Sequence, residues 1–341
     1  MREPAFWWRA DGRGGLASLL APLAAIYGAV AAARLARGGR QAAIPVVCIG
    51  NLTVGGAGKT PAALAAARML AAAGERPMFL SRGYGGALAG PLTVDPARHR
   101  AREVGDEPLL LARAAAAIVA RERVAGAAMA VAAGGSVIVM DDGFQNPSLA
   151  KDVSVLVVDA RRGIGNGRVI PAGPLRAPLD AQLARTDALI VVGTGDAAAE
   201  VAAAARTRQL PVLSASLQPD AGVVAALRNR RVLAFAGIGD PGKFFATLTD
   251  AGIAVGGTRS FPDHHRYTVA QATALCRDAE RDGLALVTTE KDLARLAGEE
   301  GMAPLAARAV ALPVTLSFAD EEAVRRLLLE RIARAPKHGG R

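Results

Sequence analysis

Residues 50–61 read Gly50-Asn51-Leu52-Thr53-Val54-Gly55-Gly56-Ala57-Gly58-Lys59-Thr60-Pro61 and directly follow the apolar run Ile44-Pro45-Val46-Val47-Cys48-Ile49. Glycines 55, 56 and 58 leave successive backbone N–H groups free to surround a phosphate, and Lys59 adds a positive charge for the β/γ oxygens. The Thr60 hydroxyl suits Mg²⁺. Thr53 replaces the first glycine of the general G-x-x-x-x-G-K-[ST] pattern. The stretch predicts a nucleotide-binding loop whose contacts come from Thr53, Val54, Gly55, Gly56, Ala57, Gly58, Lys59, Thr60 and Pro61.

The chain on either side of this loop predicts an α/β fold. An alanine-rich stretch follows Pro61 and favours a helix whose positive dipole end faces the phosphates. Apolar runs predict strands over 44–50, 76–81, 136–141, 153–159, 188–193 and 211–216, and helices are expected over 60–73, 106–120, 178–185 and 196–207. This alternation is typical of a mostly parallel sheet flanked by helices, as in P-loop NTPases.

A second series of elements begins after residue 220. Strands are expected at 232–238, 285–289 and 310–317, followed by a helix over 320–334. We therefore divide the chain into an N-terminal segment (1–40), a P-loop core (41–220), a smaller C-terminal α/β lobe (221–334) and a short basic tail (335–341). The length of 341 residues suits two such domains.

Charge and cysteine content restrict the partners and the compartment. The formal net charge of +10 favours an anionic partner: a phosphorylated substrate, an anionic membrane surface or nucleic acid. No nucleic-acid motif or aromatic-basic interleaving is present, so nucleic acid is not expected. Cys48 and Cys276 lack metal-site or redox spacing, which indicates a reducing cytosolic compartment.

The N-terminal segment contains twenty uncharged residues, 14–33, behind Phe6, Trp7 and Trp8. Its length matches a membrane span, but eight alanines, three glycines and Pro22 make the span weak, and arginines flank both ends. Aromatic and basic neighbours favour a helix lying in the membrane interface. A single span and an ordinary core helix remain alternatives, whereas a cleavable signal peptide is not expected.

A second acidic motif follows the strand predicted at 136–141, where Asp141 and Asp142 precede Gly143-Phe144-Gln145. Strand ends in a parallel sheet converge on the phosphate loop, so Asp141 is placed as the Walker-B acid that holds Mg²⁺. Asp142 and Gln145 are candidates for magnesium waters or substrate. The alternative is a solvated turn after a strand.

Three further motifs are ambiguous by themselves. Asp106 and Glu107 lie at a predicted helix start, where acids often only cap the helix. The run Phe261-Pro262-Asp263-His264-His265 fits a metal site, a solvent turn or a catalytic base, although further metal ligands at a recognisable spacing are missing. Thr288-Thr289-Glu290-Lys291-Asp292 is similar to a guanine-reading motif, but its adjacent Lys and Asp argue against GTP specificity.

Together these stretches resemble the tetraacyldisaccharide 4′-kinase family of lipid A synthesis over most of the chain. The resemblance is carried by residues 50–61, Leu80-Ser81-Arg82-Gly83-Tyr84-Gly85-Gly86, Val104-Gly105-Asp106-Glu107-Pro108, Asp141-Asp142-Gly143-Phe144-Gln145, Phe235-Ala236-Gly237-Ile238-Gly239, Phe261-Pro262-Asp263-His264-His265 and Thr288-Thr289-Glu290-Lys291-Asp292. It implies ATP-dependent phosphorylation of the 4′-hydroxyl of a tetraacylated glucosamine disaccharide 1-phosphate, giving lipid IVA.

The resemblance also implies roles for individual residues. Asp106 takes the part of the catalytic base, His264 is its partner and Asp263 supports that histidine; the choice of His264 over His265 rests on alignment. Mg²⁺ is assigned to Thr60, Glu107, Asp141 and Asp142. Lys59 stabilises charge on the transferred phosphoryl group. Substrate contacts are assigned to Arg82, Tyr84, Gln145 and Arg176, although Ala177 stands where an acid is expected in many relatives.

A lipid acceptor implies work at a membrane, so we expect the enzyme at the cytoplasmic face of the inner membrane, anchored by its N-terminal helix. A regulatory P-loop ATPase or GTPase without a lipid acceptor is the alternative. A non-catalytic membrane-surface protein that merely holds a nucleotide is the third interpretation.

Overall fold

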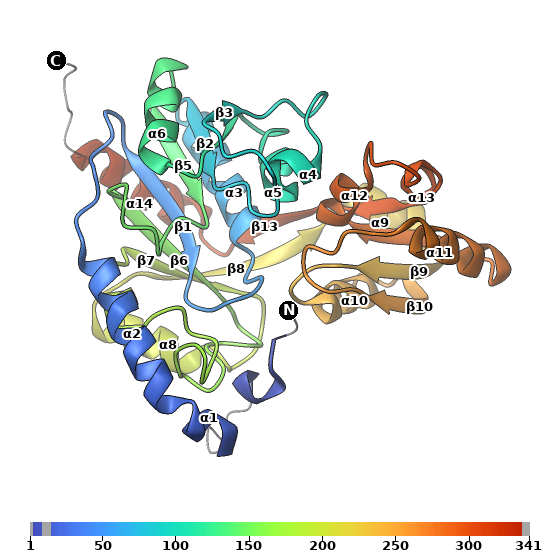
Figure 1. The fold of residues 1–341 in the computed structure, drawn as a ribbon, viewed down its shortest axis with the longest axis horizontal. Coiled ribbons are helices and arrows are strands. Elements are labelled where there is room, and N and C mark those ends of the chain that lie inside the picture. The colour runs from blue at the N-terminus through green and yellow to red at the C-terminus, as the bar shows by residue number, and fades with distance from the viewer. Residues whose placement is uncertain (1–2, 9–14, 336–341) are drawn as a thin grey trace.

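The computed structural model describes residues 3–8 and 15–335 and folds them into two α/β lobes (Figure 1). Arg9 and Arg13, which precede the uncharged stretch 14–33, and the basic tail after residue 335 lie outside this range. Each lobe has its own sheet, of nine strands and of four strands. The predicted fold class, a P-loop NTPase-like α/β protein, is confirmed.

The large sheet is parallel except at its two edges. Strand β13 pairs antiparallel with β8 at one edge and β3 pairs antiparallel with β4 at the other. In spatial order the strands are β13 (Val314–Phe318), β8 (Val212–Pro219), β7 (Ala188–Val192), β6 (Val153–Asp159), β1 (Val46–Asn51), β5 (Val137–Asp141), β2 (Pro77–Ser81), β4 (Ala117–Val119) and β3 (Leu92–Thr93).

Helices cover both faces of this sheet. One face carries α3 (Lys59–Ala72), α5 (Asp106–Leu111) and α14 (Glu321–Arg334), and the other carries α6 (Arg123–Ala132), α7 (Leu179–Leu183) and α8 (Ala199–Thr207). The short helix α4 (Ala101–Val104) precedes α5. Before the first strand lie the 3₁₀ turn η1 (Ala5–Trp8), α1 (Gly15–Leu19) and α2 (Ala21–Ala36).

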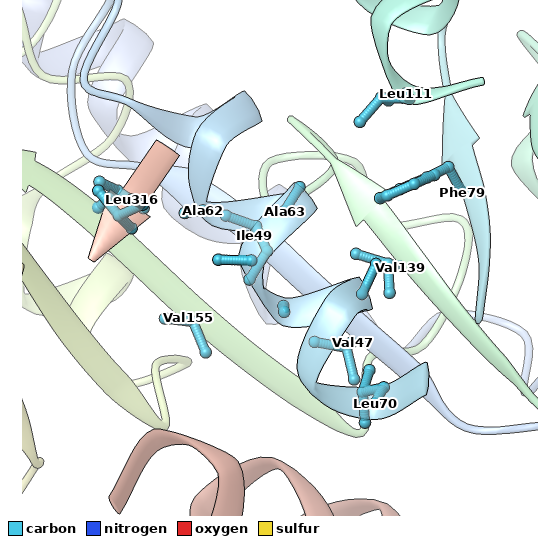
Figure 2. Packing of buried hydrophobic residues seen from close by; sticks show 14 of the residues in the cluster. Val47, Ile49, Ala62, Ala63, Leu70, Phe79, Leu111, Val139, Val155 and Leu316 are labelled. Carbon is cyan, nitrogen blue, oxygen red and sulfur yellow. The ribbon is translucent and has the colours of Figure 1, made fainter. Parts of the chain in front are cut away.

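The core explains why the central strands read as continuous apolar runs. Every residue of β1 is buried, with Val47 and Ile49 on the face toward α3 and Val46 and Cys48 on the opposite face. Figure 2 shows Val47 and Ile49 against the small side chains of α3, among them Ala62. A strand covered on both faces cannot alternate apolar and polar residues. The alanines of α3 let that helix lie close to the sheet and bring the loop before it to the strand ends.

The second lobe is a smaller version of the same architecture. Its four parallel strands follow the order β10 (Ala254–Ser260), β9 (Arg231–Ala236), β11 (Ala285–Thr289) and β12 (Val310–Leu312). Its helices are α9 (Ala221–Leu227), α10 (Pro241–Asp250), α11 (Val269–Arg281), α12 (Glu290–Leu296) and α13 (Ala303–Arg308). Helices α9 and α10 cover one face and α11 and α13 the other.

The predicted boundary between the lobes is wrong for residues 314–334. The run predicted as one strand over 310–317 is two strands in different sheets, separated by Pro313. The carbonyl of Pro313 accepts a hydrogen bond from the Asp220 backbone N–H at 2.9 Å, so the two chain crossings between the lobes lie together. Strand β13 and helix α14 then return to the first lobe, where Leu316 and Leu328 join its core.

The helix predicted over 106–120 is also wrong in its second half. It ends at Leu111, and Ala117–Val119 form β4, which pairs with β2 through Phe79 and Ala117. An alanine-rich stretch favours a helix locally, but burial between β2 and β3 determines its conformation here.

The N-terminal helices pack against the first lobe along one side only (Figure 1). Gly28 of α2 lies against Pro178 and Val169, where a side chain would be in van der Waals contact. The outer side of α1 and α2 exposes large apolar residues: Leu16, Leu19, Leu23, Ile26, Tyr27 and Val30. Within the described ranges, no helix has both the length and the apolar character needed to cross a bilayer.

Candidate active site

The phosphate loop joins the end of β1 to the start of α3, as the sequence predicts. Gly58 is in the left-handed conformation (φ +96°) and immediately precedes α3, a position where a residue with a side chain is strained. Asn51 ties the loop down, since its Nδ2 donates to the Gly55 carbonyl at 3.0 Å. At the other side, the Val54 N–H donates to Pro174 O at 2.9 Å. The loop is therefore held open around the N-terminus of α3, where backbone N–H groups and the helix dipole favour a phosphate.

The second lobe covers one side of this loop. A Cβ atom on Gly239 would lie 3.0 Å from the Gly56 N atom, so the turn after β9 approaches the loop closely. Lys243 at the start of α10 forms an ion pair with Asp159 at the end of β6. The phosphate loop thus lies at the border between the two lobes.

Asp141 ends β5 beside the loop and is 2% exposed. The Thr60 hydroxyl donates to Asp141 Oδ2 at 3.1 Å, whereas the buried Oδ1 has no hydrogen-bond partner. Burial raises the pKa of Asp141 to about 7, the neighbouring Glu107 adds to the effect, and Lys291 and Lys59 oppose it. A buried carboxylate oxygen without a donor, next to a threonine hydroxyl, fits a cation bound together with phosphate oxygens.

Among residues 3–8 and 15–335, no group of three or more His, Cys, Asp or Glu side chains converges as a metal site. Kinases hold Mg²⁺ with one or two carboxylates and the phosphates of the nucleotide. The arrangement of Asp141 and Thr60 matches that requirement and not that of an all-protein metal cage.

Asp142 is engaged by two cations. Arg176 Nη1 lies 2.7 Å from Asp142 Oδ1, and Lys59 Nζ lies 3.6 Å from Oδ2. Burial acts to raise the pKa of Asp142, but the charges of Lys59 and Arg176 outweigh burial and hold the pKa well below its usual range. Arg176 also donates from Nε to the Thr53 carbonyl at 3.0 Å. Its guanidinium therefore links Asp142 to the phosphate loop.

Asp106 is the first residue of α5, directly after Gly105. Gly105 has φ +91°, and a Cβ atom there would lie 2.6 Å from the Tyr84 carbonyl, so only glycine fits this turn. The turn brings Asp106 into the border between the lobes, where it is 2% exposed. Its Oδ1 accepts from the Glu107 N–H at 3.0 Å, within the first turn of the helix.

The partner of Asp106 across the border is His264, with Nδ1 of the imidazole 3.3 Å from Oδ1 of the carboxylate. On the other side of the ring, Nε2 lies 3.8 Å from Oδ2 of Asp263. His265 does not approach Asp106: its Nε2 lies 2.9 Å from Gln271 Oε1 and its ring stacks on Phe261. The geometry thus identifies His264, and not its neighbour His265, as the residue in contact with Asp106.

The Asp106–His264 pair is a charged one. Burial acts to raise the pKa of Asp106, but the hydrogen bond from His264 and the charges of Arg295 and Lys291 hold it well below its usual range. Burial acts to lower the pKa of His264, and the hydrogen bond and charge of Asp106 outweigh burial and raise it. Asp106 is consequently an ionised, oriented carboxylate at neutral pH.

Two of the site residues have an unusual backbone conformation. Three non-glycine residues within the described ranges have positive φ, and two of them are Asp142 (+55°) and His264 (+53°). Such conformations are uncommon for residues with side chains and gather at functional sites.

The predicted substrate residues lie in two places: the loop of Arg82 and Tyr84 is beside His264, and Gln145 is beside Asn51 and Arg176. The Tyr84 ring lies 4.8 Å from that of His264, centroid to centroid, and is 61% exposed, so it faces an open approach to the pair. Arg82 is exposed on the same loop. Gln145 donates from Nε2 to the Asn51 carbonyl at 3.0 Å and accepts from Arg176 at 3.2 Å.

Comparison with known proteins gives one family. The model of the family described as tetraacyldisaccharide-1-P 4′-kinase (LpxK) matches residues 16–333. The chain belongs to this family. Tetraacyldisaccharide 4′-kinase of Rhodopseudomonas palustris (strain BisA53) is 57% identical over 98% of this chain and 97% of its own. The enzyme of that name from Nitrobacter hamburgensis is 58% identical over 98% and 99%. The resemblance inferred from the motifs is confirmed.

A solved structure supports the same conclusion. It is described as the "apo" form of LpxK from Aquifex aeolicus in complex with ATP, and it is similar to this chain with a TM-score of 0.69 and 27% identity. The similarity covers 93% of this chain and 99% of that one. The nucleotide in that relative agrees with the phosphate loop of this kinase.

Three sets of contacts at the site of this kinase were not predicted from the sequence. Lys291 lies 2.6 Å from Glu107 Oε1, although the motif around it suggested base recognition. Arg295 contacts Asp106, and its place one turn after Lys291 on α12 is the only sequence signal for it. At the phosphate loop, a Cβ atom on Gly55 would collide with the Glu3 carboxylate, which pairs with Arg162.

Proposed function

We propose that this chain transfers the γ-phosphoryl group of ATP to the 4′-hydroxyl of a tetraacylated glucosamine disaccharide 1-phosphate, giving lipid IVA in lipid A synthesis. The observation that carries the proposal is the approach of Asp106 and His264 across the lobe border, next to a phosphate loop. A regulatory ATPase has no need of a carboxylate–histidine pair beside its phosphate loop. Membership of the kinase family supports the same function.

The nucleotide phosphates lie against the loop of residues 53–61. Lys59 and the backbone N–H groups at the start of α3 stabilise negative charge on the group in transfer, which is the main contribution a protein makes to phosphoryl transfer. Asp142 keeps Lys59 within the site through their ion pair. Arg176 positions Asp142, and we assign it this role in place of the predicted contact with the substrate phosphate, because its guanidinium is already occupied.

Asp141 and Thr60 would hold Mg²⁺ together with the phosphates of ATP. When bound, the ion neutralises charge on the β- and γ-phosphate oxygens. Glu107 lies near enough to Asp141 to raise its pKa, and its ion pair with Lys291 sets its position at the metal side of the site. On the other side of the site, Asp142 holds Lys59 and Arg176 in place through its ion pairs with them.

Asp106 accepts the proton of the attacking 4′-hydroxyl. A carboxylate with a low pKa accepts a proton late in a loose phosphoryl-transfer reaction, when the oxygen has begun to bond to phosphorus. His264 holds the carboxylate oriented, and Asp263 supports the other side of the imidazole. Tyr84 and the exposed Arg82 lie at the entrance, where an aromatic ring and a guanidinium suit a sugar and a phosphate. Gln145 lies on the phosphate-loop side of the site, where it donates to the Asn51 carbonyl and accepts from Arg176.

The acceptor is embedded in a membrane, and α1 and α2 supply a surface for approaching it. Their exposed leucines, isoleucine, tyrosine and valine form an apolar face on a protein of net charge +10. Such a face dips into the acyl boundary while cationic residues attract anionic headgroups. We place the kinase on the cytoplasmic face of the inner membrane, where ATP is present.

The test is product analysis. The purified chain is incubated in detergent with γ-labelled ATP, Mg²⁺ and the tetraacylated disaccharide 1-phosphate, and label is measured in the lipid and in free phosphate. Label in the lipid, at the 4′ position by phosphorus NMR, supports the proposal. Release of label as free phosphate alone, with or without the lipid, contradicts it and favours the regulatory ATPase.

A further inference from the structure

Arg295 makes a set of contacts that no assigned role explains. Its Nε donates to Oδ2 of Asp106 at 2.7 Å, across the lobe border and over a sequence separation of 189 residues. Its Nη1 donates to the Gly237 carbonyl and to Oδ1 of Asp292, both at 2.7 Å. The side chain is 6% exposed. A single guanidinium therefore joins the Asp106 carboxylate to the interior of the second lobe.

The anchor behind Arg295 is rigid. Asp292 is fully buried, and its Oδ1 also accepts from the Gly237 N–H at 3.0 Å and from the Tyr267 hydroxyl at 2.8 Å. Its Oδ2 accepts from Thr289 Oγ1 at 2.6 Å. These donors come from the end of β9, the loop after Pro262 and the start of α12, so Asp292 is fixed from three sides. Arg295 cannot turn away from Asp106 without breaking this network.

We propose that Arg295 is a positioning residue for phosphoryl transfer: it fixes the plane of the Asp106 carboxylate from the second lobe. Nε and Nη2 of the planar guanidinium both face Oδ2, at 2.7 and 2.5 Å, and their fixed directions hold that oxygen in a way that an ammonium does not. With Oδ1 held by the Glu107 N–H and by His264, the orientation of the carboxylate is set at both oxygens. Arg295 occupies Oδ2, which leaves Oδ1 toward His264. The inference rests on the proposed role of Asp106 as the base.

The other contacts between the lobes argue against a purely structural role for Arg295. Lys291 pairs with Glu107, Arg102 lies 3.2 Å from Glu299, and Lys243 pairs with Asp159. Three ion pairs thus already join the lobes through carboxylates other than that of Asp106. Arg295 differs from them because it contacts the reactive carboxylate and is itself anchored by a buried acid.

The test separates orientation from charge and from folding. Arg295→Gln removes both the charge and the fork, whereas Arg295→Lys keeps a charge without the planar fork. Arg308→Gln is the matched control, since Arg308 is a half-exposed arginine of the same lobe that lies 3.7 Å from Glu280. For each variant kcat, the KM values for ATP and lipid, and the thermal midpoint are measured with the full chain.

We expect Arg295→Gln to lower kcat by about 100-fold, the order of loss that a misplaced catalytic group causes, with the KM for ATP within about twofold of wild type. Arg295→Lys should recover only part of that loss, and Arg308→Gln should match wild type. Full kcat in Arg295→Lys would overturn the proposal, because charge alone would then suffice. A loss confined to the KM for ATP, or one that matches the loss of folded protein, would also overturn it.

The test remains decisive if Arg295→Gln does not fold. Arg295→Lys is then judged alone: a lower kcat at an unchanged thermal midpoint supports the proposal and an unchanged kcat rejects it. Tyr267→Phe removes one donor from Asp292 without changing charge, and it should lower kcat less than Arg295→Lys does. Asp106→Asn is measured beside them, because an active Asp106→Asn enzyme would reject the base assignment itself, independently of Arg295.

Discussion

Asp106 and His264 are separated by 158 residues and belong to different lobes, yet Oδ1 of one lies 3.3 Å from Nδ1 of the other. The first lobe supplies the phosphate loop and the carboxylate, and the second supplies the imidazole, Lys291 and Arg295. Chemistry at this border therefore needs both lobes in contact.

Lys59 is predicted to act mainly on the transferred phosphoryl group. Lys59→Ala should lower kcat/KM for ATP by about 10²–10³-fold, the usual loss when one stabilising donor is removed from a reaction centre. Arg68→Ala is the control, because Arg68 lies on the same helix with its side chain 53% exposed. Steady-state kinetics with varied ATP measure both. An unaffected kcat/KM in Lys59→Ala would remove the loop from the reaction.

Asp141 is predicted to bind Mg²⁺ at the expense of stability. Burial raises its pKa to about 7 and its Oδ1 has no hydrogen-bond partner, so the ionised group is unfavourable in the protein without a cation. Asp141→Asn should raise the Mg²⁺ concentration for half-maximal activity at least about tenfold. The thermal midpoint without Mg²⁺ should stay level or rise. An unchanged Mg²⁺ dependence would show that this residue is not a ligand.

The ion pair between His264 and Asp106 predicts a particular pH dependence of stability. The folded protein raises the pKa of His264, so its contribution is complete below the unfolded value of about 6.5 and is lost as the pH rises through the raised value. The difference in thermal midpoint between wild type and His264→Gln should be largest near pH 6 and decrease toward pH 9. A difference that grows with pH would contradict the direction assigned to this pKa.

The apolar face of α1 and α2 is predicted to bind lipid. Each large apolar side chain that enters the acyl region contributes about 1.5–3 kcal/mol, so replacing three should reduce binding by more than 100-fold. The variant Leu19→Ser, Leu23→Ser, Ile26→Ser should lose sedimentation with anionic vesicles and keep its thermal midpoint, because all three side chains are exposed. Val269→Ser on α11, also exposed, is the control. Undiminished sedimentation would place the membrane contact elsewhere.

Much of the first lobe could be predicted from the sequence because its signals are local. Glycines in a fixed spacing, a basic residue and a following helix define the phosphate loop, and the strand before Asp141 is an unbroken apolar run. The observed β1, α3 and β5 differ from the predicted ranges by one or two residues at their ends. Local sequence failed where tertiary pairing decides, as in Ala117–Val119 and at Pro313.

The site itself was only partly predictable. His264 and Asp106 were paired on family resemblance, since nothing local indicates that residues 158 positions apart meet. Arg295 and Lys291 could not be recognised because each is one of 41 lysines and arginines, and only the packing of α12 against α5 brings them to Asp106 and Glu107. Glu3 could not be recognised either, because only tertiary packing brings it to Gly55 and Arg162.

The measurement that tests the account most directly is a double-mutant cycle on kcat for lipid phosphorylation, with Asp106→Asn, His264→Ala and both together. Each single change should lower kcat by about 10²–10⁴-fold, the range for a group in acid-base catalysis. Because residues that act as one unit are not additive, the double variant should be no slower than the slower single variant. Losses that multiply would show that Asp106 and His264 act independently, contrary to the central claim.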